Sequence, residues 1–175
     1  MQTRKMVVAG FLIALGVVFP IIFHMFSMAG SIFLPMHIPV LVAGFILRGK
    51  YGFFVGLLTP IISSLLTGMP PIMPMLPIMI VELSIYGLVA GILTEKVKTN
   101  NIVGLIVAMV CGRVGSFITV FCMANLLGIV KLQPVTWIKG SITTGLPGML
   151  IQIIFIPVLL YVLKNPMKEE VLYNK

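Results

Sequence analysis

Long apolar runs, separated by short clusters of charged and turn-forming residues, divide the chain into six segments. These segments cover residues 6–24, 32–47, 51–67, 77–94, 102–125 and 140–163. A helix needs roughly 20 apolar residues to cross a bilayer, and most of the runs are close to that length. The second and third runs are the shortest, and the tight basic turn Arg-Gly-Lys-Tyr-Gly joins them. We therefore predict a single all-α membrane domain over residues 1–175, built as a bundle of six transmembrane helices.

The composition excludes a soluble domain. Of the 175 residues, 59% are hydrophobic and 9% are charged, whereas soluble domains carry about 25% charged residues. The net charge of +8 does not indicate nucleic-acid binding, because the charges lie at segment ends without a basic face or interleaved aromatic residues. The first apolar run lacks a small-residue cleavage site, so we expect a retained helix there and not a signal peptide.

Lysine and arginine residues are distributed unequally between the two ends of the predicted helices. Only Lys131 and Lys139 fall at one end, whereas nine basic residues fall at the other. Because loops on the cytoplasmic side are enriched in Lys and Arg, we expect both termini to lie in the cytoplasm. The nine residues are Arg4, Lys5, Arg48, Lys50, Lys96, Lys98, Lys164, Lys168 and Lys175.

Two charged residues lie inside the predicted helices. Glu82 is near the outer end of the fourth helix, and Arg113 is in the middle of the fifth. A charge within the membrane is costly, so each residue needs a partner or a wet cavity. Counting 1.5 Å per residue places the two residues about 10 Å apart in depth, so direct pairing would require a long reach. Two interpretations stay open: the residues pair with each other, or one or both contact a ligand.

Aromatic side chains accompany these charges at helical spacing. Tyr86 shares a face with Glu82, and Phe117 and Phe121 follow Arg113 at successive turns. A charge flanked by aromatic rings is one way to bind a flat or amphipathic molecule, and the same spacing is also typical of ordinary helix packing. At the outer end of the sixth helix, a tryptophan can contact a ligand or serve as an interfacial anchor. A lysine there can contact a ligand or extend its amine toward water. The candidates at that end are Trp137, Lys139 and Thr143.

The connection "MPPIMPMLP", residues 69–77, is apolar although it is too rich in proline to be a regular helix. Prolines need no N–H partner and hold a segment extended, and methionines pack over irregular shapes. Irregular backbone at membrane depth is tolerated where protein buries it or where it lines a cavity. The segment is therefore either a connector resting on the headgroups or a cap over an outward-opening pocket.

The stretch "FLPMHIPVLVAGFILRGKYGFFVGLLTPIISSLLTGMPP" in the second and third helices, most specifically Met36 to Pro71, resembles the S component of energy-coupling factor (ECF) transporters. The resemblance covers essentially the whole chain. It implies a substrate-binding subunit that captures a vitamin or related micronutrient from outside and docks on a transmembrane T component and two cytoplasmic ATPases. In this family the ligand lies in the outer half, between helices four to six, which would make residues 69–77 part of a lid.

The resemblance also implies a docking position on the first helix. Family members carry an Ala-x-x-x-Ala pattern there that contacts the T component, and Gly10 and Ala14 are the nearest match in this chain. Small residues at this spacing let helices approach closely, so the glycine preserves the physical basis for docking. The chain has no Gly-x-x-x-x-Gly-Lys-Ser/Thr phosphate loop, in agreement with energy supplied by a partner.

The substrate is not identified by the resemblance. The cations Arg113, Lys139 and Lys131 against the single Glu82 favour a neutral or anionic ligand. A carboxylate such as pantothenate could use the cations, and a flat ring such as pyridoxine, a flavin or a benzimidazole-type cobamide precursor could stack among the aromatic candidates. We expect no resident cofactor.

Three functions of other classes stay open, and one of them, a purely structural membrane subunit, predicts no ligand binding at all. A stand-alone ion-coupled carrier would use Glu82 as a proton relay and would accumulate substrate without ATPase partners. An intramembrane enzyme would need a nucleophile and base, or a metal cluster, at matched depth. His24 and His37 have no acid close in sequence, and their spacing is not that of a metal motif. We therefore expect neither catalytic residues nor a metal site.

Overall fold

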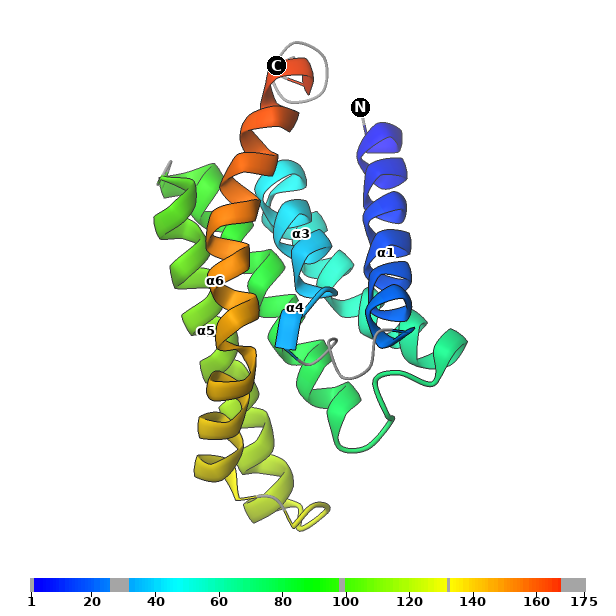
Figure 1. Ribbon diagram of the computed structural model, residues 1–175, viewed down its shortest axis with the longest axis vertical. Coiled ribbons are helices and arrows are strands. Elements are labelled where there is room, and N and C mark those ends of the chain that lie inside the picture. The colour runs from blue at the N-terminus through cyan, green and yellow to red at the C-terminus, as the bar shows by residue number, and fades with distance from the viewer. Residues whose placement is uncertain (1, 26–31, 98–99, 132, 168–175) are drawn as a thin grey trace.

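The computed structural model describes residues 2–25, 32–97, 100–131 and 133–167, and the regular elements in these ranges are helical (Figure 1). The elements are α1 (Gln2–Met25), α3 (His37–Thr67), α4 (Met75–Ile92), η1 (Leu93–Val97), α5 (Asn101–Phe121), η2 (Cys122–Leu126) and α6 (Pro134–Met167). The two η elements are π-helical turns that extend α4 and α5. The all-α membrane bundle predicted from the hydropathy pattern is therefore the observed class of fold.

Five helices in the described ranges are long and apolar enough to cross a membrane, where the sequence pattern predicted six. The difference lies in α3, which contains both of the segments expected at 32–47 and 51–67. Its first part, residues 37–47, is only about 16 Å long at 1.5 Å per residue, well short of the ~30 Å hydrocarbon core. This part cannot cross a bilayer alone, which is the physical reason for the lower number.

Helix α3 is bent back on itself at Arg48. This residue has φ 75° and ψ 176°, a conformation that is not helical and that is normally reserved for glycine. A Cβ added to Gly52 would lie 2.7 Å from the Cα of Gly44, although eight residues of a continuous helix span about 12 Å. The chain therefore reverses at Arg48, and residues 37–47 and 49–67 form two arms that lie side by side.

Helix α3 is the central element of the bundle. In the most apolar part of each helix, 67% of the α3 residues are buried, compared with 22% for α1 and α6. Helices α1 and α4 pack against α3, α5 packs against α4, and α6 contacts α5 and α3. Glycines allow the closest approach, because a Cβ on Gly87 would collide with the backbone of Gly52, and one on Gly56 with the backbone of Leu83. The outward sides of α1, α5 and α6 remain apolar and exposed, as expected for surfaces that face lipid.

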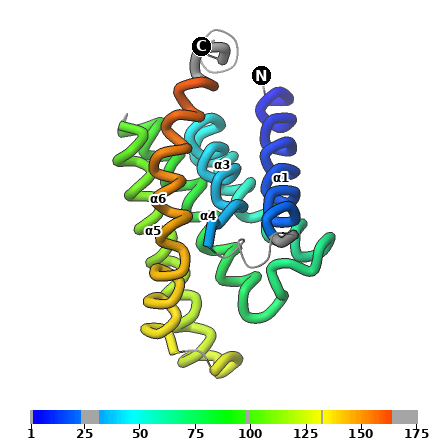
Figure 2. The backbone as a smooth tube through the Cα atoms, viewed as in Figure 1, coloured from blue at the N-terminus to red at the C-terminus, as the bar shows by residue number. Residues whose placement is uncertain are grey.

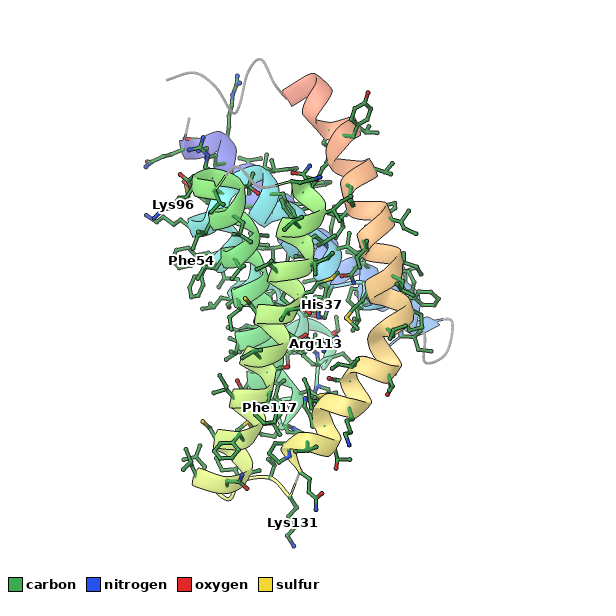
Figure 3. The ribbon with its side chains drawn as sticks, turned by 90° about the vertical axis from the view of Figure 1, so that its left-hand side faces the viewer. His37, Phe54, Lys96, Arg113, Phe117 and Lys131 are labelled. Carbon is green, nitrogen blue, oxygen red and sulfur yellow. The ribbon has the colours of Figure 1, made fainter. Side chains whose placement is uncertain are left out.

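Several basic residues gather at one end of the bundle. The first turns of α1 and the last turns of α6 lie at the same end (Figure 2). There Arg48 Nη1 lies 3.2 Å from Glu95 Oε1, and Lys5 Nζ lies 6.0 Å from the centroid of the Tyr51 ring. Lys131 lies at the opposite end (Figure 3). Lys98, Lys168 and Lys175 are outside the described residues, and so are the side chains of His24 and Lys164.

Helix α6 begins six residues earlier than the sequence pattern predicted. Pro134 is its first residue, and the N–H of Trp137 donates to the carbonyl of Gln133 at 2.9 Å. Proline is favoured at the first helical position because its fixed φ suits the helix and its missing N–H would be unpaired there in any case. Trp137 and Lys139 therefore lie in the first two turns of a helix and not in the preceding connection.

The proline-rich connection is only partly irregular. Residues 69–74 are non-helical, whereas 75–77 form the first turn of α4. The hydroxyls of Ser63 and Ser64 donate to the carbonyls of Met69 and Pro70 at 2.7 and 2.8 Å, which ties the connection to the end of α3. The side chains of Met69, Ile72 and Met73 are exposed. This exposure favours the interpretation of the segment as a connector.

Candidate functional site

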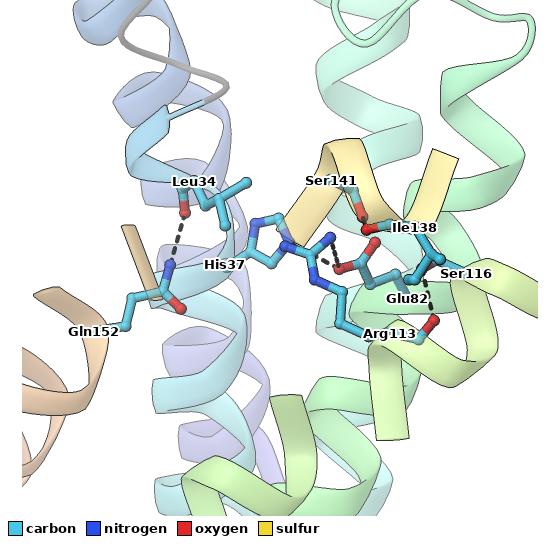
Figure 4. Close-up of polar contacts among 8 residues, drawn as sticks. All are labelled: Leu34, His37, Glu82, Arg113, Ser116, Ile138, Ser141 and Gln152. Atoms are coloured by element: carbon cyan, nitrogen blue, oxygen red, sulfur yellow. Dashed lines mark hydrogen bonds and ion pairs between the residues drawn. The ribbon is translucent and has the colours of Figure 1, made fainter. Parts of the chain in front are cut away.

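A buried ion pair joins α4 to α5 near the middle of the bundle. Arg113 Nη1 lies 2.9 Å from Glu82 Oε1, and the two side chains are 12% and 6% exposed (Figure 4). The sequence-based estimate of depth made this direct contact difficult, and the structure corrects it. The estimate counted axial rise and left direct pairing to a long side-chain reach, and the two side chains do span that gap. The pairing is therefore observed, and contact of either residue with a ligand stays a prediction.

His37, from the first turn of α3, is the third member of this cluster. Its Nε2 lies 3.6 Å from Glu82 Oε1, and its side chain is 4% exposed. Figure 3 shows His37 and Arg113 close together at mid-height of the bundle. From the sequence, His37 was considered only as a catalytic base or a metal ligand, and no acid is near it along the chain. The sequence signal that could have indicated a partner was a polar residue at the start of a long apolar run, because such a residue is expected to be buried and to need a partner.

Tyr86 completes the cluster one turn after Glu82. Its ring is 5.3 Å from the His37 ring in an edge-to-face arrangement, and the residue is 1% exposed. Gly112 makes room for this ring, because a Cβ on Gly112 would collide with it. The glycine that directly precedes Arg113 thus allows α5 to approach α4 closely enough for the ion pair to form.

Several buried polar atoms of this cluster have no hydrogen-bond partner. Within the described ranges of the chain, His37 Nδ1, Arg113 Nε and Arg113 Nη2 are buried without a partner. Buried polar groups in proteins are almost always paired, so a group of unpaired ones requires an explanation such as a bound molecule. Among the residues that the structure describes, no three His, Cys, Asp or Glu side chains are grouped to hold a metal ion.

Helix α6 and the segment before α3 cover the arginine from one side. A Cβ on Gly145 would lie 3.1 Å from both Arg113 Nη2 and the Cδ1 of Leu34. The buried Gln152 donates from Nε2 to the carbonyl of Leu34 at 3.3 Å, which fixes this segment against α6. Figure 4 shows Leu34 and Gln152 beside the ion pair. A lone glutamine in an apolar helix gave no sequence signal for this contact.

Comparison with known families supplies the identity. The family model described as "ECF transporter, substrate-specific component" matches residues 4–160. The chain belongs to this family. Comparison with curated proteins and with solved structures gave no match. The protein is therefore a multi-pass membrane protein of a transporter family and not of an enzyme family, and the resemblance noted in the sequence is confirmed.

The aromatic candidates of this S component occupy different environments. Phe117 is half-buried and Phe121 is exposed, with their ring centroids 6.5 Å apart. Trp137 is half-buried and packs against a cluster formed by Ile78, Val120 and Met123, and its Nε1 is buried without a partner. Phe117 lies between the ion pair and the end of the bundle that carries Lys131 (Figure 3).

The remaining predicted residues are not part of the buried cluster. Lys139 and Thr143 are exposed, and the Thr143 hydroxyl donates within its own helix to the carbonyls of Lys139 and Gly140 at 3.0 Å. On α1, Gly10 and Ala14 are exposed, and no atom lies within 4 Å of a Cβ built on Gly10. Of the eight predicted substrate contacts, the structure therefore brings together Glu82, Tyr86 and Arg113 and adds His37.

Proposed function

We propose that this S component is the substrate-capturing subunit of an ATP-driven importer in a prokaryotic plasma membrane. It takes a small water-soluble vitamin or vitamin precursor from the outside, with both of its termini in the cytoplasm. Pantothenate, pyridoxine, a flavin and a benzimidazole-like precursor are the candidate substrates. The two arms of α3 are then the second and third helices of a six-helix bundle, and the first of them reaches only part of the way across.

The observation that carries this proposal is the buried cluster of His37, Glu82, Tyr86 and Arg113. Charged residues inside membrane helices are rare and generally serve a ligand or ion pathway. In this cluster the ion pair satisfies the charges, yet within the described part of the chain His37 Nδ1, Arg113 Nε and Arg113 Nη2 have no hydrogen-bond partner. A binding site for a small molecule requires such convergent polar groups within an otherwise apolar surrounding.

The direction and the partners follow from the distribution of charge and from the first helix. The basic end formed by Lys5, Arg48 and Lys96 suits the cytoplasmic side. The partners in this proposal are a transmembrane T component and two cytoplasmic ATPases. Gly10 and Ala14 form the docking position, and their exposure supports this role because a partner helix could approach them closely.

Mass spectrometry of the detergent-purified full-length chain tests the proposal. We expect a vitamin-sized molecule to copurify, and the same molecule to enter proteoliposomes only when the T component, the ATPases and ATP are present. If the chain alone transports the substrate, and if uncouplers abolish this transport, the result would instead support the ion-coupled carrier. That carrier is less favourable because Arg113 already occupies the Glu82 carboxylate. If no vitamin or precursor binds, the capture function is excluded.

A further inference from the structure

The free edge of Arg113 leads to a more specific conclusion, which rests on the proposed capture function. We propose that the substrate is an electrically neutral nitrogen heterocycle that presents two adjacent hydrogen-bond acceptors, a carbonyl oxygen and a ring nitrogen, to Arg113. The proposal separates the four candidate substrates by their charge and by the acceptors on one edge of the molecule.

The first step is the charge of the site. Glu82 and Arg113 form an ion pair at 2.9 Å, so their formal charges cancel. A carboxylate ligand on Arg113 would bring a second negative charge next to Glu82 inside the membrane. Two carboxylates that share one cation repel each other, and burial increases that repulsion. The pair therefore disfavours an anionic substrate, and Arg113 similarly disfavours a cationic one.

The second step is the geometry of the unpaired donors. Glu82 uses Nη1 of Arg113, whereas Nε and Nη2 are buried and have no partner. These two nitrogens lie on one edge of the planar guanidinium and donate in parallel directions. The edge fits two acceptors side by side, as in a carboxylate or in a ring that carries a carbonyl next to an unprotonated nitrogen. Because the negative charge of Glu82 disfavours a carboxylate ligand, the ring with a carbonyl next to an unprotonated nitrogen is the remaining ligand that matches this edge of Arg113.

The third step is the space beside that edge. Helix α6 presents only a glycine there, and a Cβ on Gly145 would lie 3.1 Å from Arg113 Nη2. The side chain of Leu34 reaches the same point. Leu34 belongs to a short segment outside the regular helices, and its side chain fills the point beside the guanidinium edge. A ring would therefore reach that edge only when the Leu34 side chain takes another rotamer.

The fourth step is the surrounding surface. The rings of His37 and Tyr86 pack edge to face in the same cluster, and Nδ1 of His37 has no hydrogen-bond partner among the described residues. Phe117 follows one turn after Arg113 on α5. Aromatic faces together with groups that either donate or accept suit a flat molecule with further polar atoms on its rim. A flexible aliphatic acid would leave these rings without a stacking partner.

The test is a binding panel on the full-length chain in detergent, measured by thermal shift and calorimetry. The probes are riboflavin and 6-methylpterin, which carry the carbonyl–nitrogen edge, and pantothenate, pyridoxine and 5,6-dimethylbenzimidazole, which do not. We expect the tightest ligand to be one of the first two. If one of the other three binds most tightly, the capture function stands and this inference is overturned. If none of the five binds, this inference is also overturned, and mass spectrometry of copurifying molecules decides the capture function separately.

Three variants locate the interaction. Arg113→Lys keeps the charge but removes the paired donors, so affinity for the best ring should fall at least about tenfold. Gly145→Val should cause a similar loss, because its side chain would crowd Arg113 Nη2 and the Leu34 side chain. Lys131→Gln, at an exposed cation far from the site, is the control and should bind as the original chain does. Unchanged ring affinity in both Arg113→Lys and Gly145→Val would overturn the assignment.

Glu82→Gln provides a separate test of the charge argument. Without the carboxylate, Arg113 becomes an uncompensated cation, so the preference should shift at least about tenfold toward pantothenate relative to the ring. Because an unpaired buried charge can also destabilise the fold, the double variant Glu82→Gln, Arg113→Gln is measured beside it. The double variant should fold and lose this shift. A carboxylate preference that is equal in the single variant and the original chain would contradict the charge argument.

Discussion

At the scale of single residues, the candidate site depends on the absence of a side chain at Gly112 as much as on the polar side chains. The Tyr86 ring occupies the position where any Cβ of residue 112 would lie. This contact sets the distance between α4 and α5, and therefore allows Glu82 to meet Arg113. A sequence pattern can identify two costly charges, but it cannot give the separation of two helices.

A Gly112→Ala substitution should destabilise the protein. Alanine is normally favoured over glycine within a helix by about 1 kcal/mol, but overpacking typically costs about 1–3 kcal/mol. We expect a net decrease in Tm on the order of 5 °C, together with weaker ligand binding because the Tyr86 ring must move. Differential scanning fluorimetry in detergent measures the first effect and calorimetry the second.

Gly140→Ala is the matched control, because no atom lies within 4 Å of a Cβ at that position of α6. Its Tm should stay the same or rise. A Tm for Gly112→Ala that equals that of the control would show that Tyr86 does not set the approach of α5 to α4.

At the scale of elements, hydropathy predicted where helices exist but not how they begin, end and reverse. The run from 102 to 125 became α5 with η2 almost unchanged. The start of α6 was missed because Pro134 and the hydrogen bond to Gln133 determine it, and neither is visible as an apolar run. The turn at Arg48 was recognised, but the merging of both arms into one compact element depends on glycine contacts between Gly44, Gly52 and Gly87. Such contacts link distant positions and require the folded chain.

The reversal at Arg48 gives a prediction for that element. A non-glycine residue in this region of φ and ψ costs about 1–3 kcal/mol, whereas an exposed ion pair such as Arg48–Glu95 contributes about 0–1 kcal/mol. Arg48→Gly should therefore raise Tm by about 2–4 °C, despite the loss of the contact with Glu95. The measurement is thermal unfolding followed by circular dichroism.

Glu95→Gln separates the two contributions, since it removes the ion pair and leaves the backbone of Arg48 unchanged. Its Tm should differ little from that of the original chain. If both substitutions lower Tm equally, the ion pair would outweigh the backbone strain, contrary to the prediction.

At the scale of the whole molecule, the core helices and the peripheral helix α1 have separate roles. The core formed by α3, α4 and α5 holds the polar cluster, and α1 presents an exposed side with small residues to the surroundings. The family assignment was predictable from the block between Met36 and Pro71, because that block is specific for the family and lies in the core element. The substrate was not predictable from the sequence. The contacts proposed for it involve a few polar atoms that remain unpaired in the described residues after the helices have packed.

Leucine at Gly10 or Ala14 should block assembly without affecting substrate capture. The added side chain would prevent the close approach of a partner helix, and no atom of the described residues lies within 4 Å of a Cβ at position 10. We expect a pull-down with the T component to lose at least about 90% of the complex, equivalent to more than 1 kcal/mol of interaction. Ligand affinity in detergent should remain unchanged.

Val158→Leu, on the exposed side of α6, is the control for a change of size on another surface that faces the membrane. It should assemble normally. Normal recovery of the complex by both α1 variants would remove this helix from the interface.

The short first arm of α3 also has a consequence for biosynthesis. An arm of about 16 Å cannot be recognised alone as a membrane span, so it must be inserted together with residues 49–67 as a helical hairpin, after both have left the ribosome. A chain truncated after Leu47 and released from the ribosome should therefore leave this arm accessible to protease, whereas a released chain that extends through Thr67 should protect it. Protection of the shorter chain would show that the arm is inserted independently of its neighbour.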